Sequence, residues 1–194
     1  MAFPEYPIYS WFIVIWVGIA IITFLALFLI TAPYGRHVRN GWGPQIPSRW
    51  GWIIMESTVL VVFSLFFFSG PEKASLNYFF LGLFFLHYIN RSFIYPLRIK
   101  NTNRTMPLSI MLMAVIFNFG NGYLNGFWLG HVFPSYSMDW ISDPRFIIGV
   151  GLFFSGMAIN WHADEVLRKL RKPGETLLLR KPRLQSAGPY RAKP

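Results

Sequence analysis

The stretch His87–Tyr95 places polar side chains inside a run of residues that otherwise has the composition of a membrane-spanning helix. It contains Arg91 together with His87, Tyr88 and Tyr95. A charged side chain at membrane depth costs roughly 2.5–3.5 kcal/mol on insertion scales, so it usually faces protein or water rather than lipid. The stretch therefore indicates a membrane enzyme or carrier.

Glu56 is a second ionisable residue within an apolar run, residues 52–58. Either its carboxyl forms a structural salt bridge, with Arg91 as the partner, or it acts as a proton donor or hydrogen-bonding electrophile in a buried pocket. Tyr88 lies three residues before Arg91 on the same side of a helix, which makes it a candidate catalytic or ligand-binding residue. Tyr95, close to Pro96, is interpreted as an interfacial anchor.

Three asparagines recur on one stripe of a later apolar segment. Asn118, Asn121 and Asn125 are spaced at i, i+3 and i+7, with glycines beside them. Small residues let membrane helices approach closely, and amides hydrogen-bond between helices. The stripe therefore predicts either close helix packing or a polar ligand cavity.

A further polar stripe begins where the last apolar segment ends. Asn160, Asp164, Arg168 and Arg171 follow one another at helical spacing. One interpretation is an interfacial helix end, with cations that extend toward the lipid headgroups. The other is a nucleotide cofactor site, with arginine on phosphate and Asn or Asp on ribose or amide groups. Spacing alone does not choose between them.

The composition indicates that these residues lie on membrane-spanning helices, because 54% of the residues are hydrophobic and only 13% are charged. Five segments approach the length of about 20 apolar residues that a span needs, which predicts an all-α, multi-pass transmembrane bundle. They are Trp11 to Ile30, Trp50 to Ser69, Leu76 to Leu97, Met106 to Leu129 and Arg145 to Trp161. The sequence contains no Cys, so thiol catalysis and thiolate metal ligation are excluded, and we predict no metal site.

The charge distribution predicts the orientation. The first and third loops are basic, and nine of the 18 Lys and Arg residues lie from Arg168 onward. By the positive-inside rule the amino terminus lies outside or in a lumen and the carboxyl terminus in the cytosol. The net charge of +10 is therefore attributed to orientation and to contact with anionic lipids, and we predict no nucleic-acid binding.

The polar segments together resemble the steroid 5α-reductase family, whose members reduce 3-oxo-Δ4 steroids with NADPH. The segments occur in family order over about residues 1–175. They are Ala32-Pro33-Tyr34-Gly35-Arg36-His37, Met55-Glu56, the run His87–Tyr95, Gly120-Asn121-Gly122, Asn160-Trp161-His162-Ala163-Asp164 and Leu170-Arg171-Lys172-Pro173-Gly174-Glu175.

The resemblance implies roles for individual residues. Glu56 and Tyr88 would hold the steroid 3-keto oxygen, so that hydride from the nicotinamide reaches the β carbon of the enone. The NADPH side would be formed by five residues of this chain. They are Asn160, Asp164 and Arg171, with Asn121 and Arg91 as supports.

This chain departs from the family pattern in two places. Animal members carry Gln-Glu where this chain has Met55-Glu56, which affects the steroid preference. After Glu175 the family continues through two further spans, to seven, whereas residues 176–194 here form a basic tail that we expect to be disordered. Our hypothesis is a truncated, frame-shifted or alternative product whose transmembrane reductase domain is residues 1–175.

Other functions fit the same residues. The enzymatic alternatives are a related reductase of polyprenols or enoyl thioesters and a prenylcysteine methyltransferase, although Glu56 and Tyr88 favour a conjugated carbonyl substrate. The non-catalytic alternative is an inactive protein that binds lipid. A transporter is disfavoured, because the sequence shows no inverted repeat. The membrane is that of the endoplasmic reticulum in a eukaryote or the inner membrane in a bacterium.

Overall fold

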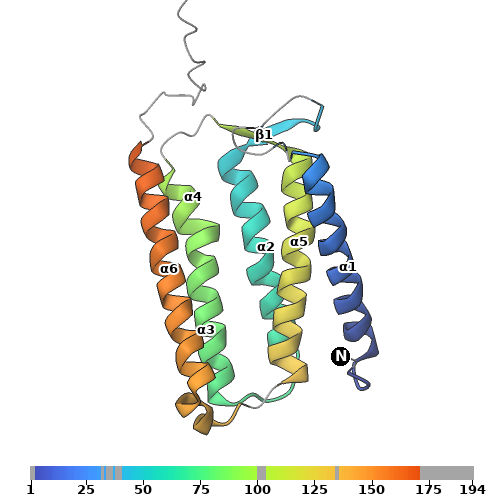
Figure 1. Cartoon of the computed structure of the whole chain (residues 1–194), viewed down its shortest axis with the longest axis vertical. Helices are drawn as coiled ribbons and strands as arrows, with labels where there is room; N and C mark the ends of the chain where they lie inside the picture. The colour runs from blue at the N-terminus through green and yellow to red at the C-terminus, as the bar shows by residue number, and fades with distance from the viewer. Residues whose placement is uncertain are drawn as a thin grey trace, which may run out of the picture.

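The chain folds as a bundle of long helices that run along one axis, with a small sheet across one end (Figure 1). The computed structural model describes residues 3–31, 33, 37, 41–99, 104–133 and 136–170. The expected tail, residues 176–194, lies outside this described part, as does Arg171. The expected all-α, multi-pass architecture is confirmed.

Within the described part of the chain, four helices are long and apolar enough to cross a membrane. They are α1 (Pro7–Leu29), α2 (Ser48–Phe68), α5 (Leu108–Phe127) with its continuation to Val132, and α6 (Pro144–Leu170). The expected third span is helical throughout, as α3 (Ser75–Ile89), a π-helical segment (Asn90–Ile94) and α4 (Tyr95–Arg98). The helix α6 continues past Trp161, as the helical spacing of the polar stripe after the fifth span predicts.

The π-helical segment lies just before a proline. Pro96 has no N–H and therefore cannot donate to the carbonyl of Ser92 one helical turn earlier. The helix widens there, and the backbone N–H of Tyr95 donates to the carbonyl of Asn90, five residues back. An inserted residue of this kind turns the side chains that follow it, and such insertions are frequent at functional sites. Arg91 is carried by this segment.

A two-stranded antiparallel sheet aligns the beginnings of α2 and α5. Strand β1 (Gln45–Pro47) pairs with β2 (Thr105–Pro107), with Ile46 opposite Met106. The backbone N–H of Ser48 donates to the carbonyl of Arg104 at 2.8 Å, which extends the pairing into α2. Each strand leads directly into its helix, so α2 and α5 both begin at the sheet. Figure 1 shows that they then run away from it in the same direction.

Glycines let α5 approach α2 closely along its length. Gly122, Gly126 and Gly130 recur every four residues, on one face of the helix. A Cβ atom at Gly126 would lie 2.5 Å from the backbone oxygen of Phe63, and one at Gly122 would lie 2.9 Å from that of Val59. Backbone contact of this kind is how small residues hold membrane helices together. The close-packing interpretation of the glycine-containing segment is therefore confirmed.

A fully buried asparagine fastens α3 to the chain after α5. The Asn77 side-chain nitrogen donates to the backbone oxygens of Leu129, at 3.2 Å, and Phe133, at 2.9 Å. Its side-chain oxygen accepts from the backbone N–H of Tyr136 at 3.2 Å. A buried amide that is satisfied in this way fixes the backbone around it, because each broken bond leaves an unpaired polar group.

Asp143 begins α6. Its carboxylate accepts the backbone N–H of Arg145 at 2.8 Å, as an N-cap residue does, and Pro144 occupies the first helical position. The Arg145 side chain also donates to it, at 2.9 Å from Nε and 2.7 Å from Nη2. These hydrogen bonds favour the ionised carboxylate and lower the pKa of Asp143 to about 2.

Candidate active site

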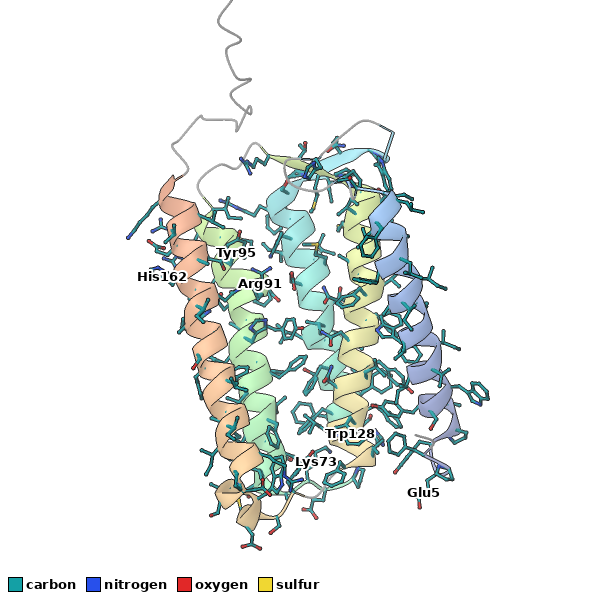
Figure 2. All side chains as sticks on the ribbon, in the orientation of Figure 1. Glu5, Lys73, Arg91, Tyr95, Trp128 and His162 are labelled. Atoms are coloured by element: carbon teal, nitrogen blue, oxygen red, sulfur yellow. The ribbon has the colours of Figure 1, made fainter. Side chains whose placement is uncertain are left out.

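The ionisable residues of the membrane segments meet toward the end of the bundle that carries the sheet. Arg91 and Tyr95 lie on the helix that faces α6, and Figure 2 shows both near this end, at about the height of His162. Glu56 comes from α2 and Asp164 from α6. Three helices therefore contribute to one polar cluster.

Arg91 is the centre of this cluster. Its Nη2 lies 3.7 Å from Oε1 of Glu56, and its Nη1 lies 3.7 Å from Oδ2 of Asp164. The side chains of Arg91 and Glu56 are 22% and 15% exposed, so the pair is largely shielded. The predicted ion pair between Glu56 and Arg91 is confirmed, and Asp164 joins it from the opposite side.

Two aromatic rings lie against the Arg91 guanidinium. Its central carbon is 4.9 Å from the ring centre of Trp52 and 5.1 Å from that of Tyr95. The indole N–H of Trp52 also donates to the backbone oxygen of Arg91 at 3.0 Å. A planar cation over aromatic faces is stabilised electrostatically, and more so where water is excluded. Tyr95 is therefore part of the site, in addition to the expected location near the helix end.

Tyr88 lies on α3 and hydrogen-bonds to α5. The side-chain nitrogen of Asn121 donates to its hydroxyl oxygen at 2.6 Å. Tyr88 also lies one helical turn before Arg91, the centre of the cluster. The centre of its ring lies 4.6 Å from that of Phe84. Tyr88 is therefore held between α3 and α5, whereas Glu56 lies on α2.

The asparagine stripe divides between packing and the site. Asn118 is buried, and its side-chain nitrogen donates to the backbone oxygen of Met55 at 2.6 Å, which fastens α5 to α2. Asn121 contacts Tyr88 instead of facing open space. Asn125 donates to Asn121, both to its backbone oxygen at 2.9 Å and to its side-chain oxygen at 2.8 Å. The packing interpretation of this stripe therefore holds for Asn118, and the ligand cavity stays a prediction for Asn121 and Asn125.

The expected cofactor residues on α6 are only partly assembled with this cluster. Asp164 faces Arg91, and its Oδ2 is buried with no hydrogen-bond donor among the described residues. A buried carboxylate oxygen of this kind is a ready acceptor for a hydroxyl or amide donor. Asn160 is exposed, one helical turn before Asp164. Arg171 lies outside the described residues.

A second group of charges follows Asp164. The carboxylate of Glu165 pairs with Arg98 of α4 at 2.9 Å and with Lys169 at 3.7 Å, and Arg168 also donates to it. The i+4 pair with Lys169 agrees with the sequence expectation, but the contact with Arg98 joins two helices. Sequence spacing cannot detect such a contact, and it holds the end of α6 against α4.

Three site residues escape sequence reasoning to different degrees. Trp52 reads as one more apolar residue of its span, and Tyr95 reads as an anchor. Asn125 reads as a member of a packing stripe. Trp52 gains its role from Arg91 on another helix, so periodicity within one helix carries no signal for it. Tyr95 and Asn125 each lie one helical turn from their partners Arg91 and Asn121, so spacing permits these contacts but does not choose between them and other roles.

Most of this chain is similar in sequence to known proteins. A family model described as 3-oxo-5-alpha-steroid 4-dehydrogenase matches residues 104–179. The 3-oxo-5-alpha-steroid 4-dehydrogenase 1 of Macaca fascicularis is 40% identical over 146 residues, which cover 74% of this chain and 55% of that protein. The Steroid 5-alpha-reductase DET2 of Gossypium hirsutum is 40% identical over 161 residues, 81% of this chain and 62% of its own length. This chain belongs to the steroid 5α-reductase family.

The 3-oxo-5-alpha-steroid 4-dehydrogenase 2 of Homo sapiens is 39% identical over 153 residues, 73% of this chain and 56% of that protein. This chain spans 55% to 62% of the length of these three relatives. The stretch that the family model matches contains Asn121, Asn160, Asp164 and Arg171. Glu56, Tyr88 and Arg91 precede that stretch.

Proposed function

We propose that this chain reduces the 4,5 double bond of a 3-oxo-Δ4 steroid and yields the 5α-reduced 3-oxo steroid, with NADPH as the reductant. The names of the relatives support the reaction class. The observation that supports the proposal is the ion pair between Glu56 and Arg91 within a membrane bundle, with Tyr88 one helical turn before Arg91. A hydrophobic ketone would reach such a site from the lipid.

Glu56 and Tyr88 would act on the steroid 3-keto oxygen. The Tyr88 hydroxyl, and the Glu56 carboxyl when it is protonated, can each donate a hydrogen bond to that oxygen. As hydride adds to C5, the β carbon of the enone, negative charge develops on this oxygen as an enolate. Donors aimed at developing charge in a site without water give the largest single contribution to many rate enhancements. A proton from solvent or a nearby acid would then complete the product at C4.

NADPH, when bound, would supply the hydride. Asp164 and Arg91 fit the cofactor side: the buried Oδ2 of Asp164 is an acceptor suited to a ribose hydroxyl or carboxamide. Asn160 and Arg171 would extend this side along α6. Asn121 would support the same cavity indirectly, because its amide already contacts Tyr88.

The membrane setting is part of the proposal. Basic residues of α2, α4 and α6 lie near the end of the bundle that carries the sheet, as Arg49, Arg98 and Lys169 illustrate. We place this end in the cytosol and the amino terminus outside or in the lumen, by the positive-inside rule. The compartment would be the endoplasmic reticulum of a eukaryote or the inner membrane of a bacterium, with membrane lipids around α1 and the other outward helix faces.

The test is conversion of a 3-oxo-Δ4 steroid by membranes that contain this chain, with and without NADPH. Glu56→Gln is the matched variant, because glutamine keeps the size but replaces the carboxyl group, which can ionise opposite Arg91 or protonate and donate, by an amide that does neither and is a much weaker acid. We expect 5α-reduced product with NADPH and its loss in Glu56→Gln. An inserted, folded chain that binds NADPH but gives no product would refute the proposed reaction for this chain.

A further inference from the structure

The direction of a hydrogen-bond chain from α5 to Tyr88 is set by a backbone carbonyl. The side-chain nitrogen of Asn125 lies 2.9 Å from the backbone oxygen of Asn121. A carbonyl oxygen only accepts hydrogen bonds, so the nitrogen of the Asn125 amide, and not its oxygen, must face this group. The same nitrogen lies 2.8 Å from the side-chain oxygen of Asn121.

This arrangement fixes the Asn121 amide in turn. Its oxygen accepts from Asn125, so its nitrogen points the other way, where it donates to the Tyr88 hydroxyl oxygen at 2.6 Å. The Tyr88 oxygen therefore accepts a hydrogen bond from the protein, and its own proton remains to be donated elsewhere. Tyr88 lies one helical turn before Arg91, which pairs with Glu56.

We infer that Asn121 and Asn125 are positioning residues that keep the Tyr88 proton directed toward a carbonyl oxygen of the substrate. This inference rests on the proposed reductase function for the identity of that acceptor. A donor to the Tyr88 oxygen also polarises the hydroxyl, because successive hydrogen bonds in a shielded site strengthen one another. The effect grows as charge develops on the substrate oxygen, which is when stabilisation raises the rate.

A purely structural role would join α3 and α5 by the same contacts, and direction separates the two roles. Asn125→Asp keeps the size of the side chain, but the carboxylate can only accept. The Asn121 amide must then turn its nitrogen toward residue 125 and its oxygen toward Tyr88. Asn121→Asp reverses the last bond directly. In both variants the Tyr88 proton is donated into the protein and is lost to the substrate.

The first experiment needs no steroid. The frequency of the C–O stretching band of a phenol depends on its hydrogen bonding. A phenol whose oxygen accepts a hydrogen bond differs in this frequency from one whose O–H donates a hydrogen bond. We would record the band of Tyr88 in the full chain in lipid nanodiscs at neutral pH, as the infrared difference between each protein and its Tyr88→Phe counterpart. We expect an acceptor band in the wild type and a donor band in Asn121→Asp and Asn125→Asp, with Asn160→Asp like the wild type. An unchanged Tyr88 band in both variants of the chain would overturn the inference.

The second experiment uses a 3-oxo-Δ4 steroid labelled at the carbonyl carbon. We expect kcat of Asn125→Asp to fall by at least about 10-fold, with little change in KM. The upper limit is the roughly 100- to 1000-fold fall expected for complete loss of one donor. The bound carbonyl band should shift as it does in Tyr88→Phe. If the wild type binds no steroid, the proposed function fails while the steroid-free spectra still decide the direction of the chain. Full kcat in Asn125→Asp would overturn the positioning role even if the reductase proposal stands.

Discussion

The Nη2 atom of Arg91 lies 3.7 Å from Oε1 of Glu56, across the space between two membrane helices. The same guanidinium faces Asp164 at the same distance. The two distances are equal, so the cation is shared between two carboxyl groups. Both exceed ordinary hydrogen-bond length, so the attraction is that of opposite charges. The residue proposed to polarise the substrate and the residue proposed to meet the cofactor therefore depend on one arginine.

Removal of the Arg91 cation should weaken the folded bundle. Arg91→Gln leaves Glu56 and Asp164 without their counter-ion, and we expect a loss of about 1–3 kcal/mol in the free energy of unfolding, the usual cost of a buried polar group left unpaired. Arg91→Lys keeps the charge but loses the planar group that lies over Trp52 and Tyr95, so its loss should be smaller. Unfolding in mixed micelles measures both.

The control is Arg145→Gln, which removes an arginine at the opposite end of the bundle that is 79% exposed. Its effect should stay below about 1 kcal/mol, as for other exposed ion pairs. An Arg91→Gln protein as stable as wild type would show that the shared contacts do not contribute to folding.

Tyr88→Phe should reduce turnover without unfolding the protein. The ring that packs on Phe84 is retained, and only the hydroxyl is lost. Loss of one donor to a developing oxyanion costs roughly 100- to 1000-fold in kcat. Steady-state kinetics with a 3-oxo-Δ4 steroid measures the effect. Tyr78→Phe, on the same helix but with a side chain 49% exposed, should keep wild-type turnover. Equal rates for the two variants would exclude Tyr88 from the reaction.

Gly126→Ala should separate α2 from α5. The new methyl group would lie 2.5 Å from the Phe63 backbone oxygen, and backbone cannot move aside as a side chain can. Overpacking of this kind typically costs about 1–3 kcal/mol. Gly151→Ala on α6 is the matched control, because nothing lies within 4 Å of the added atom. If both alanine variants unfolded at the same denaturant concentration, the close contact between Gly126 and Phe63 would not contribute to the stability of the fold.

Hydropathy and charge predict the parts of this fold that each helix determines by itself. The helical segments and the polar positions Glu56 and Arg91 follow from the cost of placing polar groups in lipid, which acts on every residue separately. The ion pair between Glu56 and Arg91 follows only as one of two alternatives for Glu56, because an opposite charge stabilises a carboxylate that is removed from water.

Contacts that depend on helix register could not be predicted in the same way. The Trp52 ring on α2 lies against the Arg91 guanidinium, a contact between two helices that a repeat within one helix does not predict. Likewise, the hydrogen bond from Asn121 to Tyr88 joins α5 to α3, and its direction depends on the orientation of the Asn121 amide. Both contacts arise from relations between helices that a repeat within each helix does not contain.

The start of α6 should respond to acid through Asp143. The Arg145 hydrogen bonds form only with the ionised carboxylate, so they lower its pKa from the ordinary 3.8 to about 2. Because the folded pKa is the lower one, this pairing stabilises the fold fully above pH 3.8 and is lost as the pH falls through about 2. Carboxyl ¹³C NMR of aspartate-labelled protein in nanodiscs, from about pH 1.5 to 6, gives the midpoint directly.

Arg145→Gln should return that midpoint toward 3.8, since it removes the side-chain donors and the opposite charge. The backbone N–H at position 145 remains, so part of the lowering should persist. Arg168→Gln, near the other end of α6, should leave the Asp143 midpoint unchanged. A wild-type midpoint at 3.8 would mean that neither the Arg145 side chain nor its backbone N–H holds the carboxylate in solution.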